Sequence, residues 1–520
     1  MSSLLASVCL VSLEKSSPRN EFISFPGAMR KTFGLSHATF TLALQTGILV
    51  AMSASLNKDD IDIVDTAELD VEQQAPDVGD DASLPLDERA IAVLAHNDRG
   101  DYTAPAGDLY PHQWLWDSCF TAIGLRHLDV VRAQAELVSL LRGQWHNGML
   151  PNMIFSSDPG YNRDRNYWQS WINPNSPDDV ATSGITQPPM FAEAVWQVGE
   201  KLSNAERRSW FKYMLPRIIE YHQWLYNDRD PHNEGLVLLL HPWETGLDNT
   251  PPWMTELAEH RLPTWIGLIR TLRLEPVVNM FRRDHRSIPA EQRFSTIEIL
   301  TLFNAQRRLR RKQYDTLKIL DRGLFSIEDL SFNCIFIRAN TRLQDIARFC
   351  HRELPEDLLA RMTKTEAALE QLWDEYAGTY WSRDFVTHKL LKQPSIATLM
   401  PLYAGCISKD RAAKLVAMLE NRHMFGPEFP IPSVPLDSPK YDSNRYWQGP
   451  TWVNTNWLII DGLRRYGYND HANALTESTL EMVDKNGFAE YFNPETGAPL
   501  GARNFAWTAA LVLDMVQQKK

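Results

Sequence analysis

Cysteine is scarce in this sequence, and its spacing excludes the sites that cysteine usually builds. The 520 residues include five cysteines, none of them in a Cys-x-x-Cys arrangement: Cys9, Cys119, Cys334, Cys350 and Cys406. An odd number of widely separated thiols supports neither a disulfide framework nor a zinc or redox motif. We therefore expect a reducing, cytoplasmic compartment.

Several catalytic and membrane signatures are also absent. The sequence has no Gly-x-x-x-x-Gly-Lys phosphate loop, no His-Glu-x-x-His zinc motif and no Gly-x-Ser-x-Gly nucleophile turn. No apolar run reaches the ~18–20 residues that a membrane-spanning helix needs. We therefore expect no metal, no cofactor and no membrane partner.

A basic surface is lacking too, because the net charge of −12 comes from one stretch. Twelve acids and no Lys or Arg lie between Asp59 and Glu88. Without them, the remaining 53 acids balance the 53 bases. The rest of the protein is electrically balanced, and nothing in it indicates a nucleic-acid partner.

The first 84 residues differ from the rest in composition. They contain no tryptophan and end in the acidic run, which cannot bury enough surface to fold. We expect residues 1–84 to be a disordered leader and residues 85–520 to form one folded domain. Met29-Arg-Lys followed by an apolar stretch from Phe40 has the shape of a signal peptide, although Gln45 and Thr46 interrupt it. Secretion therefore stays an alternative to the cytoplasm.

Helical periodicity dominates the chain beyond residue 85. Apolar positions recur at helical spacing in eight stretches: 125–144, 188–202, 205–227, 298–320, 355–376, 411–421, 451–466 and 470–486. Long alternating strands are hard to find. Many helices joined by loops rich in Gly, Pro, Trp and Asn suggest helix pairs arranged in a ring, with the loops at one end forming a funnel.

Tryptophans stand next to acids and amides in those loops. All 17 lie between Trp114 and Trp507. Three stretches combine them with polar residues: Tyr110-Pro-His-Gln-Trp-Leu-Trp-Asp117, Trp243-Glu-Thr-Gly-Leu-Asp-Asn249 and Tyr446-Trp-Gln-Gly-Pro-Thr-Trp452. Flat rings cover the apolar faces of a pyranose, and neighbouring polar groups hydrogen-bond its hydroxyls. The pattern therefore indicates a sugar site.

Four carboxyl groups in these aromatic surroundings are candidates for catalysis: Asp117, Glu244, Asp248 and Glu490. Hydrolysis of a glycosidic bond needs two carboxyl groups, one held protonated and one ionised. Glu244 and Asp248, four residues apart, would share a face if that stretch is helical. Any single one of these acids can also be explained as a helix cap or a turn anchor.

The motifs resemble the glycoside hydrolases related to mannosylglycerate and glucosylglycerate hydrolases, of the family 63 type. The resemblance runs from about residue 86 to 516 and rests on ordered motifs, among them Tyr110-Pro-x-x-Trp-x-Trp-Asp117, Trp243-Glu-x-Gly-x-Asp-Asn249, Tyr446-Trp-x-Gly-Pro-x-Trp452 and Phe488-Ala-Glu-Tyr491. It implies an all-α (α/α)6 toroid, that is, a six-hairpin glycosidase with one large catalytic domain and an inverting mechanism.

The same resemblance implies roles for individual residues. Asp248 would be the general acid and Glu490 the general base, while Glu244 would only support them. Eight residues would line the subsite of the sugar that is cleaved off: Tyr110, Trp114, Trp116, Asp117, Gln187, Trp243, Tyr446 and Trp447. Arg293 would hold the carboxylate of a glycerate leaving group, but the tyrosine that follows this arginine in similar hydrolases is missing here.

Three alternatives to a glycosyl-glycerate hydrolase stay open at this level. One is a trehalase-like or oligosaccharide-trimming α-glucosidase on the same toroid. Another is a sugar-binding protein without catalysis, although such a protein has no need of both Asp248 and Glu490. The third is a purely structural toroid with buried aromatic stretches. The sequence leaves the sugar, the leaving group and the oligomeric state undecided.

Overall fold

The computed structural model describes residues 78–79, 81–107, 109–158, 162–259, 262–279, 288–321 and 323–519. The chain divides into two units, Met1–Val71 and Glu72–Lys520, and every described residue lies in the second. Most of the predicted leader, with its possible signal segment, lies outside the described residues, so the leader and the domain boundary at residue 85 stay predictions.

Helices make up nearly all of the regular structure, as the sequence predicts. Six of the described helices form an inner set: α5 (Leu115–Leu125), α8 (Phe191–Gly199), α16 (Leu330–Phe349), α18 (Pro401–Ala404), α20 (Val453–Arg465) and α22 (Ala506–Lys519). Six more form an outer set: α4 (Leu86–Asn97), α6 (Val130–Leu141), α9 (Asn204–Arg229), α17 (Glu356–Ala368), α19 (Lys409–Glu420) and α21 (Asn469–Asn486).

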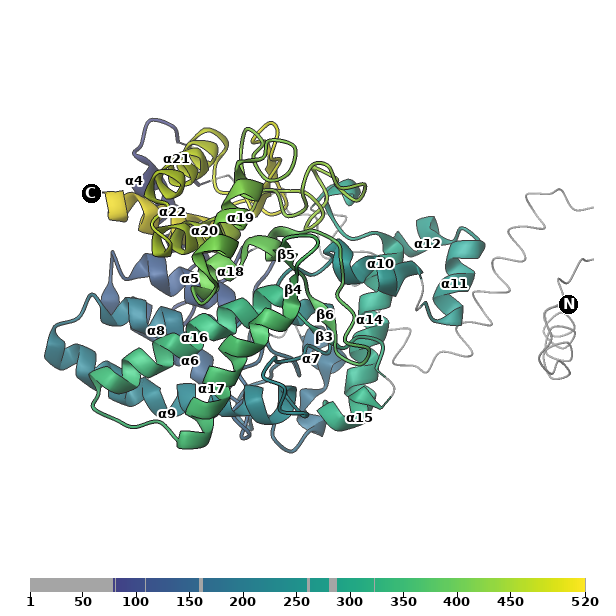
Figure 1. Cartoon of the computed structure of the whole chain (residues 1–520), viewed down its shortest axis with the longest axis horizontal. Coiled ribbons are helices and arrows are strands. Elements are labelled where there is room, and N and C mark those ends of the chain that lie inside the picture. Colours follow the sequence, from purple (N-terminus) through teal and green to yellow (C-terminus); the bar gives the residue numbers. More distant parts are fainter. Residues whose placement is uncertain are drawn as a thin grey trace, which may run out of the picture. The chain divides into compact units, whose positions relative to one another are not determined.

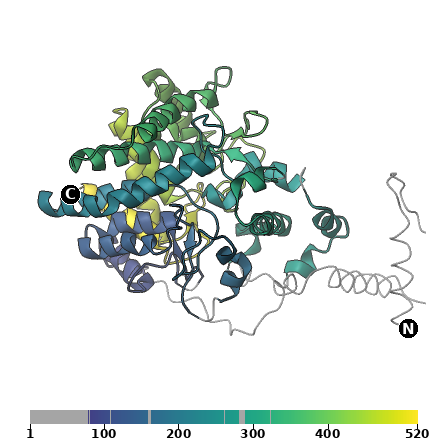
Figure 2. The same cartoon turned by 90° about the horizontal axis from the view of Figure 1, so that it is seen from below.

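The inner helices close into a ring within the described part of the chain. Each contacts the next, in the order α5, α8, α16, α18, α20, α22 and back to α5. The outer helices cover them: α6 lies against α5 and α8, α9 against α8 and α16, α17 against α16, α19 against α18, α21 against α20 and α22, and α4 against α22. Outer and inner helices alternate along the chain, which is a toroid of six helix pairs. Figure 1 shows α4 and α22 side by side where the ring closes, and Figure 2 shows the same helices from below.

The inner helices are buried on almost every side. All eleven residues of α5 are buried, from Leu115 to Leu125. A helix surrounded by other helices has no polar face, so it lacks the amphipathic period that predicts a surface helix. Periodicity does not predict the inner helices α5, α16 and α22. It does predict the outer helices α6, α9, α17, α19 and α21 and the inner helices α8 and α20, in the stretches 188–202 and 451–466.

Caps and left-handed residues set helix boundaries that periodicity misplaces. Helix α6 begins at Val130 rather than near residue 125, because the Asp129 carboxylate accepts the N–H groups of the first turn. The stretch 298–320 is two helices, α14 (Thr296–Arg311) and α15 (Thr316–Leu320). Gln313 and Tyr314 lie between these two helices and have positive φ angles, and Asp315 caps the second helix.

The remaining elements are short and lie in the loops. Four are helices of the connections, in addition to α14 and α15: α7 (Asn162–Trp168), α10 (Pro251–Glu259), α11 (Thr264–Thr271) and α12 (Glu275–Asn279). Five are 3-10 turns: η3 (Ser170–Ile172), η4 (Pro242–Glu244), η5 (Ala290–Gln292), η6 (Leu369–Leu372) and η7 (Ile396–Leu399). The strands pair in antiparallel twos: β1 (Gln113–Trp114) with β2 (Met153–Ile154), β3 (Ile327–Glu328) with β6 (Arg383–Asp384), β4 (Trp373–Asp374) with β5 (Thr379–Tyr380), and β7 (Tyr491–Phe492) with β8 (Pro499–Leu500).

The connections from outer to inner helices carry the aromatic and acidic motifs. They join α4 to α5, α6 to α8, α9 to α16, α19 to α20 and α21 to α22. In a ring of this kind, the N-terminal ends of the inner helices face one side, and the connections into them gather there. The motifs therefore converge although they are spread over nearly 400 residues of sequence.

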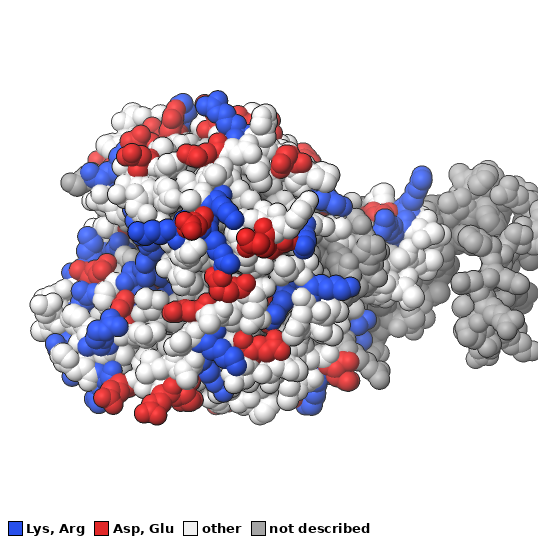
Figure 3. All heavy atoms as spheres, in the orientation of Figure 1, with Lys and Arg blue, Asp and Glu red and all other residues white. Residues whose placement is uncertain are grey.

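The surface shows no block of charge of one sign on the face in Figure 3, where Lys and Arg alternate with Asp and Glu. None of the described helices is long and apolar enough to cross a membrane.

Candidate active site

One cavity collects residues from all of these connections. It holds about 420 Å³ of space free of protein atoms, part of it open to solvent. Nine residues expected from the sequence line it: Tyr110, Trp114, Trp116, Asp117, Gln187, Asp248, Tyr446, Trp447 and Glu490. Four others complete the wall and were not predicted: Pro105, Gly246, Phe505 and Trp507.

Asp248 reaches the cavity from an irregular turn. The 3-10 turn η4 ends at Glu244, and Gly246 has a φ of +71°. Glu244 and Asp248 therefore do not share a helix face, contrary to that expectation. A Cβ at Gly246 would come within 2.6 Å of the Trp116 ring, so only glycine lets this turn approach the aromatic wall.

Glu244 is fully buried and points away from the cavity. Its carboxylate forms a bidentate ion pair with Arg229, at 2.7 and 2.9 Å, and accepts the N–H groups of Leu240, His241 and Thr186. Every oxygen is thus engaged by donors. The supporting role expected for Glu244 agrees with this geometry, since the pair anchors the turn that presents Asp248.

Asn249, next to Asp248, forms hydrogen bonds with the loop before α20. Its side-chain Oδ1 accepts the Trp447 N–H at 3.0 Å, and its carbonyl accepts the Gln448 side-chain amide at 3.0 Å. Between these contacts, Tyr446 Oη donates to Asp248 Oδ2 at 3.4 Å. Tyr446 has a φ of +40°, a strained value for a residue with a side chain.

Glu490 stands at the start of the β7–β8 hairpin, and three donors hold its carboxylate. Ala502 N–H donates to Oε2 at 3.0 Å, Tyr110 Oη to Oε1 at 3.3 Å, and Arg293 Nη1 to Oε2 at 3.5 Å. The turn that brings Ala502 close depends on Gly501, which has a φ of +71° and whose Cβ would lie 2.6 Å from Glu490 Oε2.

The two carboxyl groups differ in the groups that surround them. Burial raises the pKa of Asp248 to about 7, and the nearby Glu490 adds to this, against the opposing effect of Arg293. Burial also raises the pKa of Glu490, but Arg293, the Ala502 N–H and Tyr110 all favour its ionised form. Burial thus raises the pKa of both carboxyl groups, and three donors oppose that shift at Glu490, whereas Tyr446 is the side-chain donor at Asp248.

Stacked aromatic rings form one wall. Trp447 lies face to face with Trp452, with centroids 3.8 Å apart, and Trp452 stacks in turn on Tyr491. Trp116 contacts both Trp447 and Trp507, at 6.5 and 5.5 Å between centroids. Rings that pack on one another in this way hold a fixed orientation toward a ligand.

Three of the residues that line the cavity carry a buried polar atom without a protein partner. Among the described residues that line the cavity, Trp114 Nε1, Gln187 Oε1 and Trp507 Nε1 are buried and make no hydrogen bond. Buried polar atoms are normally satisfied, so two donors and an acceptor left open in a cavity fit a polyhydroxylated ligand. Burial raises the pKa of Asp117 well above its ordinary value, and both other carboxyl groups act in the same direction.

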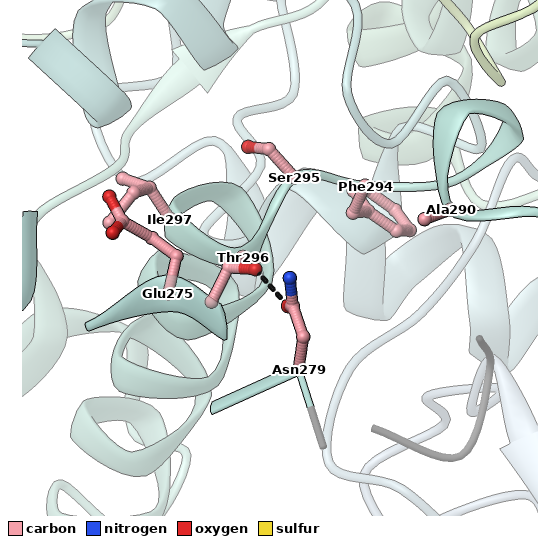
Figure 4. Close-up of a pocket in the computed structure, with 7 residues that line it drawn as sticks. All are labelled: Glu275, Asn279, Ala290, Phe294, Ser295, Thr296 and Ile297. Atoms are coloured by element: carbon pink, nitrogen blue, oxygen red, sulfur yellow. Dashed lines mark hydrogen bonds between the residues drawn. The ribbon is translucent and has the colours of Figure 1, made fainter. Parts of the chain in front are cut away.

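Arg293, which the resemblance assigns to substrate binding, contacts the Glu490 carboxylate but does not line the cavity. It is buried, and its guanidinium lies 4.7 Å from the centre of the Tyr446 ring and 5.8 Å from that of Tyr110. The next residue, Phe294, packs its ring against Tyr446 at 5.0 Å and also lines a second hollow, with Glu275, Asn279, Ala290, Ser295, Thr296 and Ile297. Figure 4 shows this hollow and the Thr296–Asn279 hydrogen bond that crosses it.

Trp243 departs from the expected set, because it does not line the cavity. It belongs to η4, and its ring packs against His241, Trp168 and Phe303 at 4.6 to 6.0 Å between centroids. The turn that follows at Gly246 directs Asp248 inward while Trp243 contacts the neighbouring loop. The family resemblance assigned Trp243 to the sugar subsite, but Trp243 is not among the residues that line this cavity.

No group of three or more potential metal ligands occurs among the described residues. The chemistry available to the cavity is that of carboxyl groups, aromatic rings and hydrogen-bond donors.

Comparison with known proteins gives consistent results. Residues 110–508 match the model of the mannosylglycerate hydrolase MGH1-like glycoside hydrolase domain. The chain is 36% identical over 430 residues to the mannosylglycerate hydrolase of Thermus thermophilus, a match that covers 82% of this chain and 99% of that protein. It is 32% identical over 443 residues to the glucosylglycerate hydrolase of Mycolicibacterium hassiacum, covering 82% and 96%.

Solved structures agree with the fold. A crystal structure of the family 63 mannosylglycerate hydrolase of Thermus thermophilus, in complex with Tris and D-glycerate, matches with a TM-score of 0.73 and 35% identity over 83% of this chain and all of that one. The neutral trehalase of Saccharomyces cerevisiae matches with a TM-score of 0.51 and 18% identity, covering 80% and 73%, which is a likeness of fold alone. The predicted (α/α)6 toroid is confirmed.

Proposed function

The chain belongs to the MGH1-like glycoside hydrolase family, and we propose that it hydrolyses the α-glycosidic bond of a small glycosyl-glycerate with inversion at the anomeric carbon. The sugar is glucose or mannose, since relatives at similar identity are a mannosylglycerate hydrolase and a glucosylglycerate hydrolase. The proposal extends from the family, which is established, to the substrate and to the roles of individual residues.

The contrast between Asp248 and Glu490 is the observation that carries the proposal. Both lie on one cavity, yet Asp248 has a pKa of about 7 and one weak donor, while Glu490 receives three donors. An inverting glycosidase needs such a pair, one group to supply a proton and one to remove one. A sugar-binding protein without catalysis would not need two carboxyl groups in such different surroundings.

In the proposed mechanism, the Asp248 carboxyl protonates the glycosidic oxygen as the bond to the anomeric carbon breaks. Glu490 takes a proton from a water molecule that attacks the same carbon from the opposite face. Inversion requires a separation of about 6.5–9.5 Å between the two carboxyl groups, to admit that water. The products are a free sugar of inverted anomeric configuration and the hydroxyl compound released from it.

The aromatic wall and the open polar atoms support a pyranose in the cavity. Trp116 and Trp447 offer ring faces to the apolar side of the sugar, and Gln187 and Trp114 offer hydrogen bonds to its hydroxyls. Arg293 does not line the cavity, but it lies against the lining residue Tyr446, and its positive charge there would favour an anionic leaving group. Its guanidinium also contacts Glu490, so it would serve the base and the leaving group together.

Substitution of the two carboxyl groups tests the assignment. Asp248→Asn and Glu490→Gln should each lower kcat by at least ~10³-fold while the variants keep a folded circular-dichroism spectrum. Asp178→Asn and Glu477→Gln are matched controls, because they make the same chemical changes on exposed carboxylates and should leave kcat unchanged. Activity that survives in both catalytic variants would refute the roles given to Asp248 and Glu490.

Product analysis tests the substrate and the stereochemistry. The wild-type enzyme is incubated with glucosylglycerate, mannosylglycerate, trehalose and a short α-glucan, and the first anomer formed is identified by proton NMR. Release of the β-anomer from a glycosyl-glycerate is expected. First appearance of the α-anomer would contradict inversion, and turnover of trehalose or the glucan alone would favour the trehalase-like or oligosaccharide-trimming alternatives.

A further inference from the structure

Gln292 is a polar residue outside the cavity that contacts the segment carrying the base at two points. It ends the 3-10 turn η5 and directly precedes Arg293, whose backbone is extended. The side chain of Gln292 is partly exposed and does not line the cavity. Its contacts join two parts of the chain about 200 residues apart.

The first contact is made by the side chain. Gly501 N–H donates to Gln292 Oε1 at 3.0 Å. The next N–H along the chain, that of Ala502, donates to Glu490 Oε2 at 3.0 Å. Because Gly501 adopts a left-handed conformation, this turn depends on its contacts to keep both N–H groups in place.

The second contact is made by the main chain. Tyr491 Oη donates to the carbonyl of Gln292 at 2.6 Å. Tyr491 directly follows Glu490, is fully buried and stacks on Trp452, so it is a rigid anchor. Gln292 therefore binds the ends of both strands of the hairpin, one beside Glu490 and one beside Ala502.

We propose that Gln292 is a positioning residue, which fastens the Arg293 segment to the β7–β8 hairpin and thereby holds both the guanidinium and the Ala502 N–H on Glu490. This inference rests on the proposed function, because it concerns the group assigned as the general base. Gln292 touches neither the cavity nor the reacting atoms, so it acts through these two donors.

Loss of the side-chain contact has a defined electrostatic result. Arg293 and the Ala502 N–H both lower the pKa of Glu490 against the effect of burial. If both donors move away, the pKa of Glu490 rises. Since the base must be ionised, the acid limb of the kcat/KM profile moves to higher pH, by roughly 0.5–1 unit for a partly weakened charge interaction.

The test uses Gln292→Met, which keeps the length of the side chain but removes the amide oxygen that accepts the Gly501 N–H. We expect kcat/KM to fall about 3–10-fold on the acid side of the profile, with recovery toward the wild-type value near the optimum. Glu291→Gln, at the exposed neighbouring position of η5, is the matched control and should leave the acid limb in place.

Tyr491→Phe provides a second, conservative perturbation. It removes only a hydroxyl and keeps the stacked ring. Because this hydroxyl contacts both the Gln292 carbonyl and Arg293, its loss loosens the same segment and should shift the acid limb in the same direction. If Gln292→Met fails to fold, the result for Tyr491→Phe decides the matter.

The outcomes separate this inference from the proposed function. An equal loss of kcat/KM at every pH, with unmoved limbs, would overturn the positioning role of Gln292 while Glu490 remains the base. Full activity of Glu490→Gln would instead overturn the proposed function itself. A shifted acid limb in both variants, with an unshifted limb in Glu291→Gln, is the supporting result.

Discussion

The same substitution that should abolish activity, Asp248→Asn, should also stabilise the protein above neutral pH. Burial raises the pKa of Asp248 from its ordinary value of 3.8 to about 7 in the folded state. A group whose folded pKa is raised favours the folded state fully below the unfolded pKa, and this contribution is lost as the pH rises through the folded pKa. Asparagine has nearly the same shape but does not titrate, so the Asp248→Asn variant does not lose this stability as the pH rises.

The magnitude follows from the two pKa values. Between pH 5 and pH 8, the ionisation of Asp248 should cost the folded wild-type protein about 2–3 kcal/mol more than it costs the unfolded chain. This is an upper estimate, because Asp248 is partly open to the cavity. For a unit of about 450 residues, it corresponds to a change of about 2–3 °C in melting temperature.

Calorimetry or fluorescence melting of the wild-type protein and the Asp248→Asn variant at pH 5 and pH 8 measures the effect. The melting temperature of the variant, relative to that of the wild-type protein, should be about 2–3 °C higher at pH 8 than at pH 5. Asp178→Asn, on an exposed carboxylate, should show no such gain. If the variant and the wild-type protein differ in melting temperature by the same amount at both pH values, Asp248 does not have a raised pKa. The assignment of Asp248 as the general acid would then have no physical support.

Two further outcomes follow from the same geometry. The alkaline limb of the kcat/KM profile should lie near pH 7, where Asp248 loses its proton, and a limb about two units or more higher would contradict the assignment of the acid. Gly501→Ala should lower kcat by about 10-fold or more, because its Cβ would lie 2.6 Å from Glu490 Oε2 and displace the carboxylate. Gly467→Ala is the control for backbone strain, since Gly467 has a similar φ and open space around it. Equal activity of the two variants would refute a special role for the Gly501 turn.

The sequence predicted the helical class and the kind of site, because both depend on local patterns. Periodic stretches identified five outer helices and two inner ones, and aromatic motifs beside Asp117, Asp248 and Glu490 identified a cavity that the structure assembles. Its catalytic roles remain proposals. The sequence could not show which residues meet across the ring, since that depends on contacts between connections hundreds of residues apart.

What the sequence missed has physical reasons. Helix α5 shows no period because it is buried all round. Trp243 was assigned to the sugar subsite by the family resemblance, which does not reveal that the turn at Gly246 directs Trp243 and Asp248 to different places. Phe505 and Gln292 were not assigned a role from the sequence, although Gln292 directly precedes Arg293. They matter only through the segments that the fold places against them.

The closure of the ring links the integrity of the fold to activity. Asp248 lies in the middle of the chain, whereas Glu490 lies just before α22, the helix that packs on α4 and α5 to complete the circle. A fluctuation that detaches this last helix would carry the hairpin of Glu490 away from its partners while most of the toroid stays helical. The enzyme should therefore lose turnover in mild denaturant before it loses its circular-dichroism signal. Catalysis would report on the packing of α22 against α4 and α5, and circular dichroism on the remaining helices.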